Sequence, residues 1–177
     1  MAAATPTQPP KFTHVMNLRA YMSRNGSAAG CHRGGATRHL APLTGGFLKG
    51  VEGTRAEGLD VELMPGGSDW LMVDDTTSMC HLDVRTHGTN KAGDGFFVYY
   101  TGYLGHDKAA AQFTSWDPEA KTTKGGDHHW WTNPNFETSS TFQTISVHLM
   151  LRPLSFPHTL PLFIDIPRRK SCALRGL

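Results

Sequence analysis

Three ionisable side chains stand close enough in the sequence to act together as acids, bases or anion-binding groups. Asp83 lies two residues from both His81 and Arg85, in a run (79–87) where polar and apolar residues alternate. This alternation predicts a β-strand, and side chains two apart on a strand project to the same side, roughly 6.5 Å apart. A carboxylate beside a guanidinium stays ionised, and beside an imidazole it favours the charged ring. The set therefore predicts acid–base chemistry, or binding of an oxyanion or a carboxylated ligand.

The site depends on which face of this strand points inward. We predict that the polar face lines a central lumen. Its ionisable groups, joined by Asp69 at the start of the preceding strand, form the predicted catalytic set: Asp69, His81, Asp83 and Arg85. Leu82 and Val84 would then pack outward, under a helix, a loop or a partner subunit. The alternative is that the polar face meets solvent, with Asp83–Arg85 a surface pair worth under about 1 kcal/mol. In that case Leu82 and Val84 fill the barrel, as apolar side chains normally do.

Aromatic and imidazole rings are numerous enough to line a cavity. Four rings in a row, at 128–131, rarely share one core face, so some should face a cavity or cover its mouth. We predict that these and neighbouring rings bind the substrate: Trp70, Tyr99, His129, Trp131 and Phe136. Each of them alone is more often a core residue, and only the set favours a pocket.

The elements around these residues are mostly short strands. Alternating patterns predict strands at 12–22, 59–63, 70–73, 79–87 and 96–100, with a further candidate at 141–151. Pro65, Gly66 and Gly67 predict a tight reversal joining two antiparallel strands. Residues 28–38 are predicted to be a loop, and Asp107 is predicted to cap a short helix over 108–113. Prolines allow at most one short strand, around 162–164, after residue 152.

Composition limits the class of protein. The chain of 177 residues, with 19 Gly and 11 Pro, is predicted to fold as one turn-rich all-β domain over 12–151. Residues 1–11 are predicted to be a disordered leader, and 152–177 an irregular Pro- and Arg-rich segment. Four of the 17 basic residues lie among the last eleven residues, which hold no acid, so the rest of the chain has 13 basic against 15 acidic residues. No basic patch for nucleic acid is therefore predicted in the folded part. No apolar segment is long enough for a membrane span. Three cysteines without metal-type spacing indicate reduced thiols and a cytoplasmic location.

A metal site is an alternative that the spacing disfavours. His81, Asp83, His87 and His129 supply ligand types, but His81 and His87 lie about 20 Å apart on an extended strand. We therefore predict no metal and no other cofactor. Phosphate-binding loops, nucleophile elbows and dinucleotide fingerprints are missing from the sequence.

Several motifs, in order and spacing, resemble the DUF3237 (UPF0311-like) family. They are Thr44-Gly45-Gly46-Phe47 with Gly50, then Leu63 to Trp70, then Leu82-Asp83-Val84-Arg85, and finally Thr132 to Thr138. The resemblance covers about residues 14–148 and implies a closed, lipocalin-like antiparallel β-barrel with a central cavity. It includes Asp69, Trp70, Asp83 and Arg85, and this favours the lumen over the solvent face. Fungal relatives commonly accompany secondary-metabolite pathways.

Two functions remain open. In the first, the cavity performs cofactor-free isomerase-, cyclase- or lyase-type acid–base catalysis on a polyketide- or terpenoid-like substrate. In the second, the barrel binds such a metabolite without converting it. Either way the expected partner is a small hydrophobic metabolite, with no nucleic acid and no membrane, and a homodimer is left open.

Overall fold

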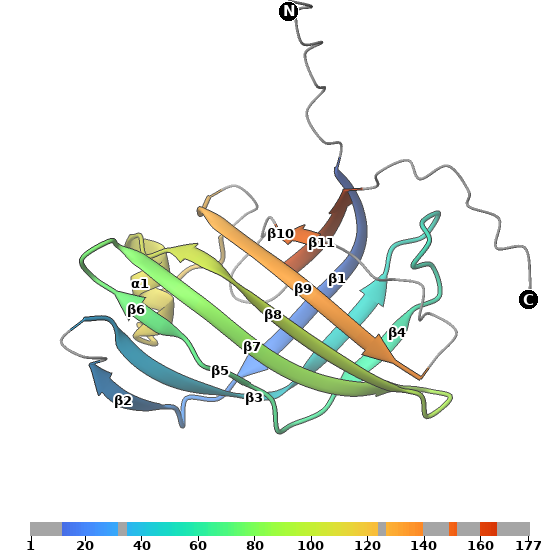
Figure 1. The fold of residues 1–177 in the computed structure, drawn as a ribbon, viewed down its shortest axis with the longest axis horizontal. Helices are drawn as coiled ribbons and strands as arrows, with labels where there is room; N and C mark the ends of the chain where they lie inside the picture. Colours follow the sequence, from blue (N-terminus) through green and yellow to red (C-terminus); the bar gives the residue numbers. More distant parts are fainter. Residues whose placement is uncertain (1–11, 32–34, 124–126, 140–148, 152–159, 166–177) are drawn as a thin grey trace, which may run out of the picture.

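The computed structural model describes residues 12–31, 35–123, 127–139, 149–151 and 160–165. These ranges contain eleven strands and one helix (Figure 1). In chain order they are β1 (Phe12–Met22), β2 (Ser27–Cys31), β3 (Thr37–Gly50), β4 (Asp60–Leu63), β5 (Ser68–Asp69), β6 (Met72–Asp74), β7 (Met79–Asn90), β8 (Gly95–Gly105), α1 (Lys108–Thr114), β9 (Trp130–Thr138), β10 (Leu149–Leu151) and β11 (Leu160–Asp165).

The strands form one antiparallel sheet that closes into a barrel. Its main path runs β10-β11-β1-β3-β4-β7-β8-β9, and β9 and β10 lie side by side. In Figure 1 the long strands β7, β8 and β9 cross one wall, and β1 and β3 lie behind them. The predicted all-β barrel with one short helix is therefore confirmed.

Alternation along β7 decides which side chains fill the barrel. Leu82 and Val84 are buried at 6% and 3% exposure, whereas Arg85 and His87 are exposed. The neighbouring strand β8 repeats the pattern with Val98 buried. Burying these apolar side chains provides most of the driving force for closing the sheet. Leu82 and Val84 face inward, so the prediction that they pack outward is wrong.

The segment around Pro65–Gly67 interrupts a strand and does not reverse the chain. β4, β5 and β6 each pair antiparallel with both β3 and β7, so all three run in the same direction between those strands. Leu43 N–H donates to Gly67 O at 2.8 Å, which keeps the interruption attached to β3. A Cβ on Gly67 would lie 2.5 Å from Arg85 O, so the glycine permits close approach to β7. The predicted hairpin is therefore wrong. The break in alternation marks an interruption after which the chain continues in the same direction between β3 and β7.

One strand was not predicted from the sequence, and another contains an irregularity. The segment 28–38 was expected to be a loop, but β2 pairs with the first residues of β3 as a hairpin. In β1 a register shift between His14 and Met16 lets two consecutive residues, Val15 and Met16, be buried. Such bulges add a residue to one strand and change the facing of those before it.

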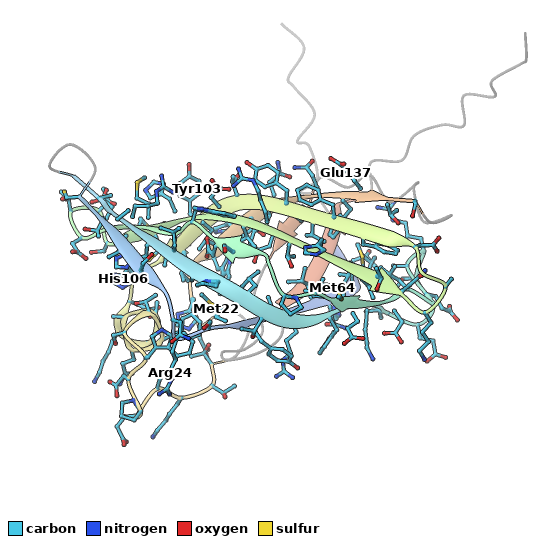
Figure 2. All side chains as sticks on the ribbon, turned by 90° about the horizontal axis from the view of Figure 1, so that it is seen from below. Met22, Arg24, Met64, Tyr103, His106 and Glu137 are labelled. Atoms are coloured by element: carbon cyan, nitrogen blue, oxygen red, sulfur yellow. The ribbon has the colours of Figure 1, made fainter. Side chains whose placement is uncertain are left out.

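Helix α1 covers one end of the barrel. The Asp107 carboxyl caps it, accepting a hydrogen bond from Ala110 N at 2.9 Å, as predicted. Ala110 is fully buried, and Phe113 packs with it against a cluster that includes Leu82 and Leu104. Figure 2 shows α1 on the side of His106, Met22 and Arg24, whereas Tyr103 and Glu137 project from the opposite, outer face.

The C-terminal part of the described chain contributes to the barrel wall. β11 pairs with β1 and with β10, so a strand lies within the segment 152–177 that was expected to be irregular. It matches the single short strand predicted around 162–164. The expected leader 1–11, the end 167–177 and residues 140–148 of the expected strand 141–151 lie outside the described residues. Within the described residues, no helix is long and apolar enough to span a membrane.

Candidate functional site

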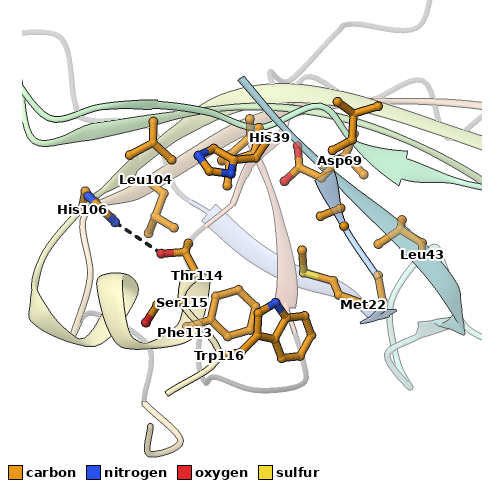
Figure 3. Close-up of a pocket in the computed structure, with 18 of the residues that line it drawn as sticks. Met22, His39, Leu43, Asp69, Leu104, His106, Phe113, Thr114, Ser115 and Trp116 are labelled. Atoms are coloured by element: carbon orange, nitrogen blue, oxygen red, sulfur yellow. Dashed lines mark hydrogen bonds between the residues drawn. The ribbon is translucent and has the colours of Figure 1, made fainter. Parts of the chain in front are cut away.

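The candidate site is a pocket inside the barrel at the end covered by α1 (Figure 3). Its volume is about 820 Å³, within the range of pockets that hold drug-sized ligands. Six aliphatic side chains from four strands and the chain between β5 and β6 form much of its wall: Leu18, Leu43, Leu71, Leu82, Val84 and Leu104. Four aromatic side chains complete it: Tyr100, Phe113, Trp116 and Trp130.

Asp69 provides the most deeply placed charge of this pocket. The two-residue strand β5 holds it between Ala41 of β3 and Val84 of β7. The residue is 7% exposed, and its carboxyl points into the pocket (Figure 3). Asp83 N–H donates to Asp69 Oδ1 at 3.1 Å. The sequence predicted Asp69 as a site residue, and the structure places it in the pocket.

The environment of Asp69 alters its acidity. Burial raises the pKa of its carboxyl from 3.8 to about 6, and the negative charge of Asp83 adds to this rise. The hydrogen bond from Asp83 N and the positive charge of Arg38 act in the opposite direction. Desolvation dominates because a buried carboxylate loses water that one N–H does not replace. A carboxyl group with a pKa of about 6 can exchange a proton near neutral pH.

His39, Tyr100 and His106 are among the other polar side chains that line the pocket. His39 lies next to Asp69 on the strand side of the pocket, held by β3, whose His39 N–H donates to Leu71 O at 2.7 Å. Tyr100 is 5% exposed, and burial together with the charge of Asp69 raises the pKa of its hydroxyl. At the α1 side, His106 Nε2 lies 3.3 Å from Thr114 Oγ1 and its Nδ1 lies 3.8 Å from exposed Asp75. The strand side thus carries a carboxyl, an imidazole and a phenol.

Sequence reasoning did not select His39, Tyr100, Phe113 or Trp116. Trp130, by contrast, belongs to the run of rings at 128–131 of which some were expected to face a cavity. One signal was present, because His39 alternates with Ala41 and Leu43 on one face of β3. For Phe113 and Trp116 the sequence held no such signal, because no local pattern places α1 against the end of the barrel.

An aromatic–cation contact lies at the mouth of the pocket. The guanidinium carbon of Arg24 lies 5.5 Å from the centre of the Trp116 ring, and Phe113 lies 6.2 Å from the same ring. Trp116 follows α1 with φ 58°, an unusual value for a residue other than glycine. The contact joins the segment after β1 to the segment after α1. Both Arg24 and Trp116 line the pocket.

The remaining predicted catalytic residues lie outside the barrel. Asp83 and Arg85 form an ion pair of 3.1 Å with 31% and 45% of their side chains exposed. Arg85 lies 5.1 Å from the Trp70 ring and 4.9 Å from the Tyr99 ring. The prediction that Asp83, Arg85 and His81 face the lumen is therefore wrong. The two rings flank the Arg85 guanidinium on the outer face, and their faces attract its positive charge there.

The predicted substrate-binding rings are also dispersed. Trp70 and Tyr99 contact Arg85 on the outer face, and Trp131, 37% exposed, lies 6.0 Å from the His129 ring on the same side. Phe136 points inward and packs against the main core, away from the pocket lining. Of the nine predicted site residues, the structure brings only Asp69 into the pocket.

The alternative metal set does not come together. Among the described residues, which include His81, Asp83, His87 and His129, no group of three or more His, Cys, Asp or Glu side chains could hold a metal ion. His81 instead lies 5.1 Å from the Tyr103 ring.

Comparisons with known proteins agree with the fold. The family described as "Protein of unknown function (DUF3237)" matches residues 10–144. No curated protein matches the chain. A conserved protein of unknown function from Rhodopseudomonas palustris superimposes with a TM-score of 0.72 at 17% identity, covering 90% of this chain and 100% of that one.

Two other solved structures are similar. A protein of unknown function from Clostridium acetobutylicum has a TM-score of 0.63 at 18% identity, with 89% of this chain and 99% of that chain covered. A "beta-barrel like protein" from Acinetobacter baumannii has a TM-score of 0.61 at 16% identity, with coverages of 92% and 97%. At such low identity these structures support the fold alone.

Proposed function

Since the chain belongs to the DUF3237 family, whose description assigns no function, we propose its function from its own pocket: it binds a small, mainly apolar molecule inside the barrel. The observation that carries this proposal is the 820 Å³ pocket with aliphatic and aromatic walls and a buried carboxyl. Apolar surface removed from water contributes about 25 cal/mol per Å² to binding. The outer-face ion pair Asp83–Arg85 has no part in this proposal.

A neutral fluorescent probe tests the proposal directly. We expect anthracene-methanol to bind with one-to-one stoichiometry, measured by fluorescence titration. The variant Ala111→Trp should abolish binding, because Ala111 lines the pocket from α1 and a larger side chain there occupies the space. The matched control is Thr101→Trp, because Thr101 is exposed on the outer face of β8. Failure of the probe to bind, or equal binding by Ala111→Trp, would overturn the proposed function.

A second function is favoured by one observation, the raised pKa of Asp69 beside His39. In this proposal Asp69 and His39 perform acid–base catalysis of the isomerase, cyclase or lyase type, without a redox cofactor. A mass comparison of candidate polyketide- or terpenoid-like molecules before and after incubation tests it. Conversion by the wild type, with binding but no conversion by Asp69→Asn, would support catalysis. Recovery of every bound molecule unchanged would contradict catalysis and support binding without conversion.

The setting of either function is also a proposal. We place the protein in the cytoplasm, because Cys31 and Cys80 are both free thiols. We further propose a role in secondary metabolism, which an apolar pocket of this size would suit. A homodimer is not required by the pocket, and sedimentation of the full chain tests it.

A further inference from the structure

The charged side chains that line the pocket differ in how deeply they are buried. Asp69 is 7% exposed, whereas Arg24 and Lys108 at the mouth are exposed, and Asp75 has 89% of its side chain exposed. Arg19 also borders the pocket, but its guanidinium lies 5.9 Å and 6.0 Å from the rings of Tyr21 and Phe47. Among the described residues that line the pocket, its deep part therefore carries one carboxyl, and no lysine or arginine side chain is directed at it.

The Asp69 carboxyl has an oxygen available to a ligand. Its Oδ1 accepts the N–H of Asp83, and among the described residues no other hydrogen bond reaches the carboxyl. The groups that act on it electrostatically are Asp83 and Cys80 of β7, Arg38 of β3 and Tyr100 of β8, with His39 of β3 nearby. Arg38 gives only partial compensation, because its Nη1 donates to Trp70 O at 2.5 Å.

Resting on the proposed binding function, we propose that the ligand carries a basic amine that pairs with Asp69 while its apolar body fills the rest of the pocket. A cation brought to a buried carboxylate gains more than at the surface, because the local dielectric is low. The nearby Tyr100 ring adds a face that attracts ammonium groups. Together the carboxyl and the aromatic ring form a receptor for a protonated amine, and a ligand carboxylate would be repelled.

The acidity of Asp69 agrees with this assignment. Its pKa of about 6 reflects a carboxylate that the protein alone compensates incompletely. An ammonium group would stabilise the ionised form and lower that pKa, so amine binding and ionisation of Asp69 favour each other. A neutral hydroxyl or carbonyl ligand does not require the ionised form.

Three probes with the same ring system test the charge preference by calorimetric titration: anthracene-methylamine, anthracene-methanol and anthracene-carboxylate. We expect the wild type to bind the amine about tenfold more tightly than the alcohol, and the carboxylate most weakly. In Asp69→Asn the amine should lose this advantage, so that amine and alcohol bind with similar affinities. The matched control is Asp60→Asn, since Asp60 is an exposed carboxylate outside the pocket and should alter nothing.

The pH dependence in the wild type provides a test that requires no variant. Between about pH 7.5 and pH 5 the amine stays protonated while Asp69 gains a proton, so amine affinity should fall about tenfold and alcohol affinity should stay constant. Equal binding of amine and alcohol, or amine binding that strengthens as pH falls, would overturn the amine assignment alone. Absence of binding by all three probes would overturn the proposed function as well.

Discussion

The backbone N–H of Asp83 donates to Asp69 Oδ1 across 3.1 Å, while the two side chains lie on opposite faces of the barrel wall. Asp69 faces the pocket and Asp83 faces outward beside Arg85. Asp83 therefore influences the pocket through its main chain and its charge. Both residues stand in motifs that resemble the family, and their structural roles differ.

Replacing neighbouring residues of β7 should separate the two faces. Asp83→Asn retains the N–H to Asp69 and removes only an exposed ion pair, so the free energy of unfolding should fall by less than about 1 kcal/mol. Leu82→Asp places a charge in the pocket wall and should cost more than about 3 kcal/mol or prevent folding. Urea denaturation measures both. Loss of probe binding in folded Asp83→Asn would show that the outer carboxyl has a functional role.

The inward face of β7 marks the limit of prediction from the sequence. Alternation identified the strand and its two faces, and by default the apolar face of a small barrel strand points inward. The family resemblance of Asp83 and Arg85 favoured the opposite orientation, which the structure does not have. The strand itself, the helix cap at Asp107 and the barrel class were all predictable, because each depends on local pattern or on the family resemblance. Burial of Leu82 and Val84 favours the observed orientation. On the outer face Trp70 and Tyr99, from other parts of the sequence, flank Arg85.

Asp69→Asn should stabilise the protein at neutral pH. In the folded state the pKa of Asp69 is raised from 3.8 to about 6, so the folded protein holds this proton more tightly than the unfolded chain does. The resulting stabilisation is fully present below the unfolded pKa and is lost as pH rises through the folded pKa. Asparagine does not titrate and can still accept the N–H of Asp83. The variant should therefore gain up to about 3 kcal/mol relative to wild type at pH 7.5, and this gain should shrink to under about 1 kcal/mol near pH 4 and vanish below about pH 3.

Thermal unfolding of both proteins across this pH range checks the difference. Asp60→Asn serves as the control, because Asp60 is 49% exposed and lies outside the pocket. A variant less stable than wild type at pH 7.5 would mean that Arg38 compensates the carboxylate more strongly than burial penalises it.

Gly102→Ala should disrupt the contact between β8 and β9. A Cβ at this position would overlap Trp131 O and approach the Thr132 side chain, so the strands would have to move apart. We expect a loss of at least about 2 kcal/mol in the free energy of unfolding. Gly95→Ala in the same strand is the matched control, because no atom lies within 4 Å of its added Cβ. Similar, small effects of both substitutions would contradict the close packing described.

The strand interruption at Pro65–Gly67 shows a second limit of sequence reasoning. Proline followed by two glycines breaks alternation in the same way whether the chain reverses or shifts within a strand. The deciding interactions are distant in sequence, since Leu43 N–H bonds to Gly67 O and the Arg85 backbone occupies the space above Gly67. The same dependence on distant partners explains why α1, correctly predicted as a helix, could not be placed over the pocket.

Asp107 should link the stability of α1 to the integrity of the pocket. Its Oδ1 accepts from Ala110 N at 2.9 Å and its Oδ2 lies 2.6 Å from His128 Nδ1. Burial acts to raise the pKa of Asp107, but the bonds from Ala110 and His128 outweigh it and hold the pKa below its ordinary value. The stabilisation is therefore present above the unfolded pKa and is lost as pH falls through the folded value.

Removing this carboxyl should weaken both the helix and ligand binding. Asp107→Ala should cost about 1–2 kcal/mol at pH 7 through the lost cap, with a smaller difference from wild type below about pH 4. Because Ala111 and Phe113 of α1 line the pocket, the same variant should bind the neutral probe more weakly. Asp107→Asn retains a capping side chain and should recover most of the stability. If Asp107→Asn proves as costly as Asp107→Ala, the contact with His128 is what holds α1 over the pocket, and the cap contributes little.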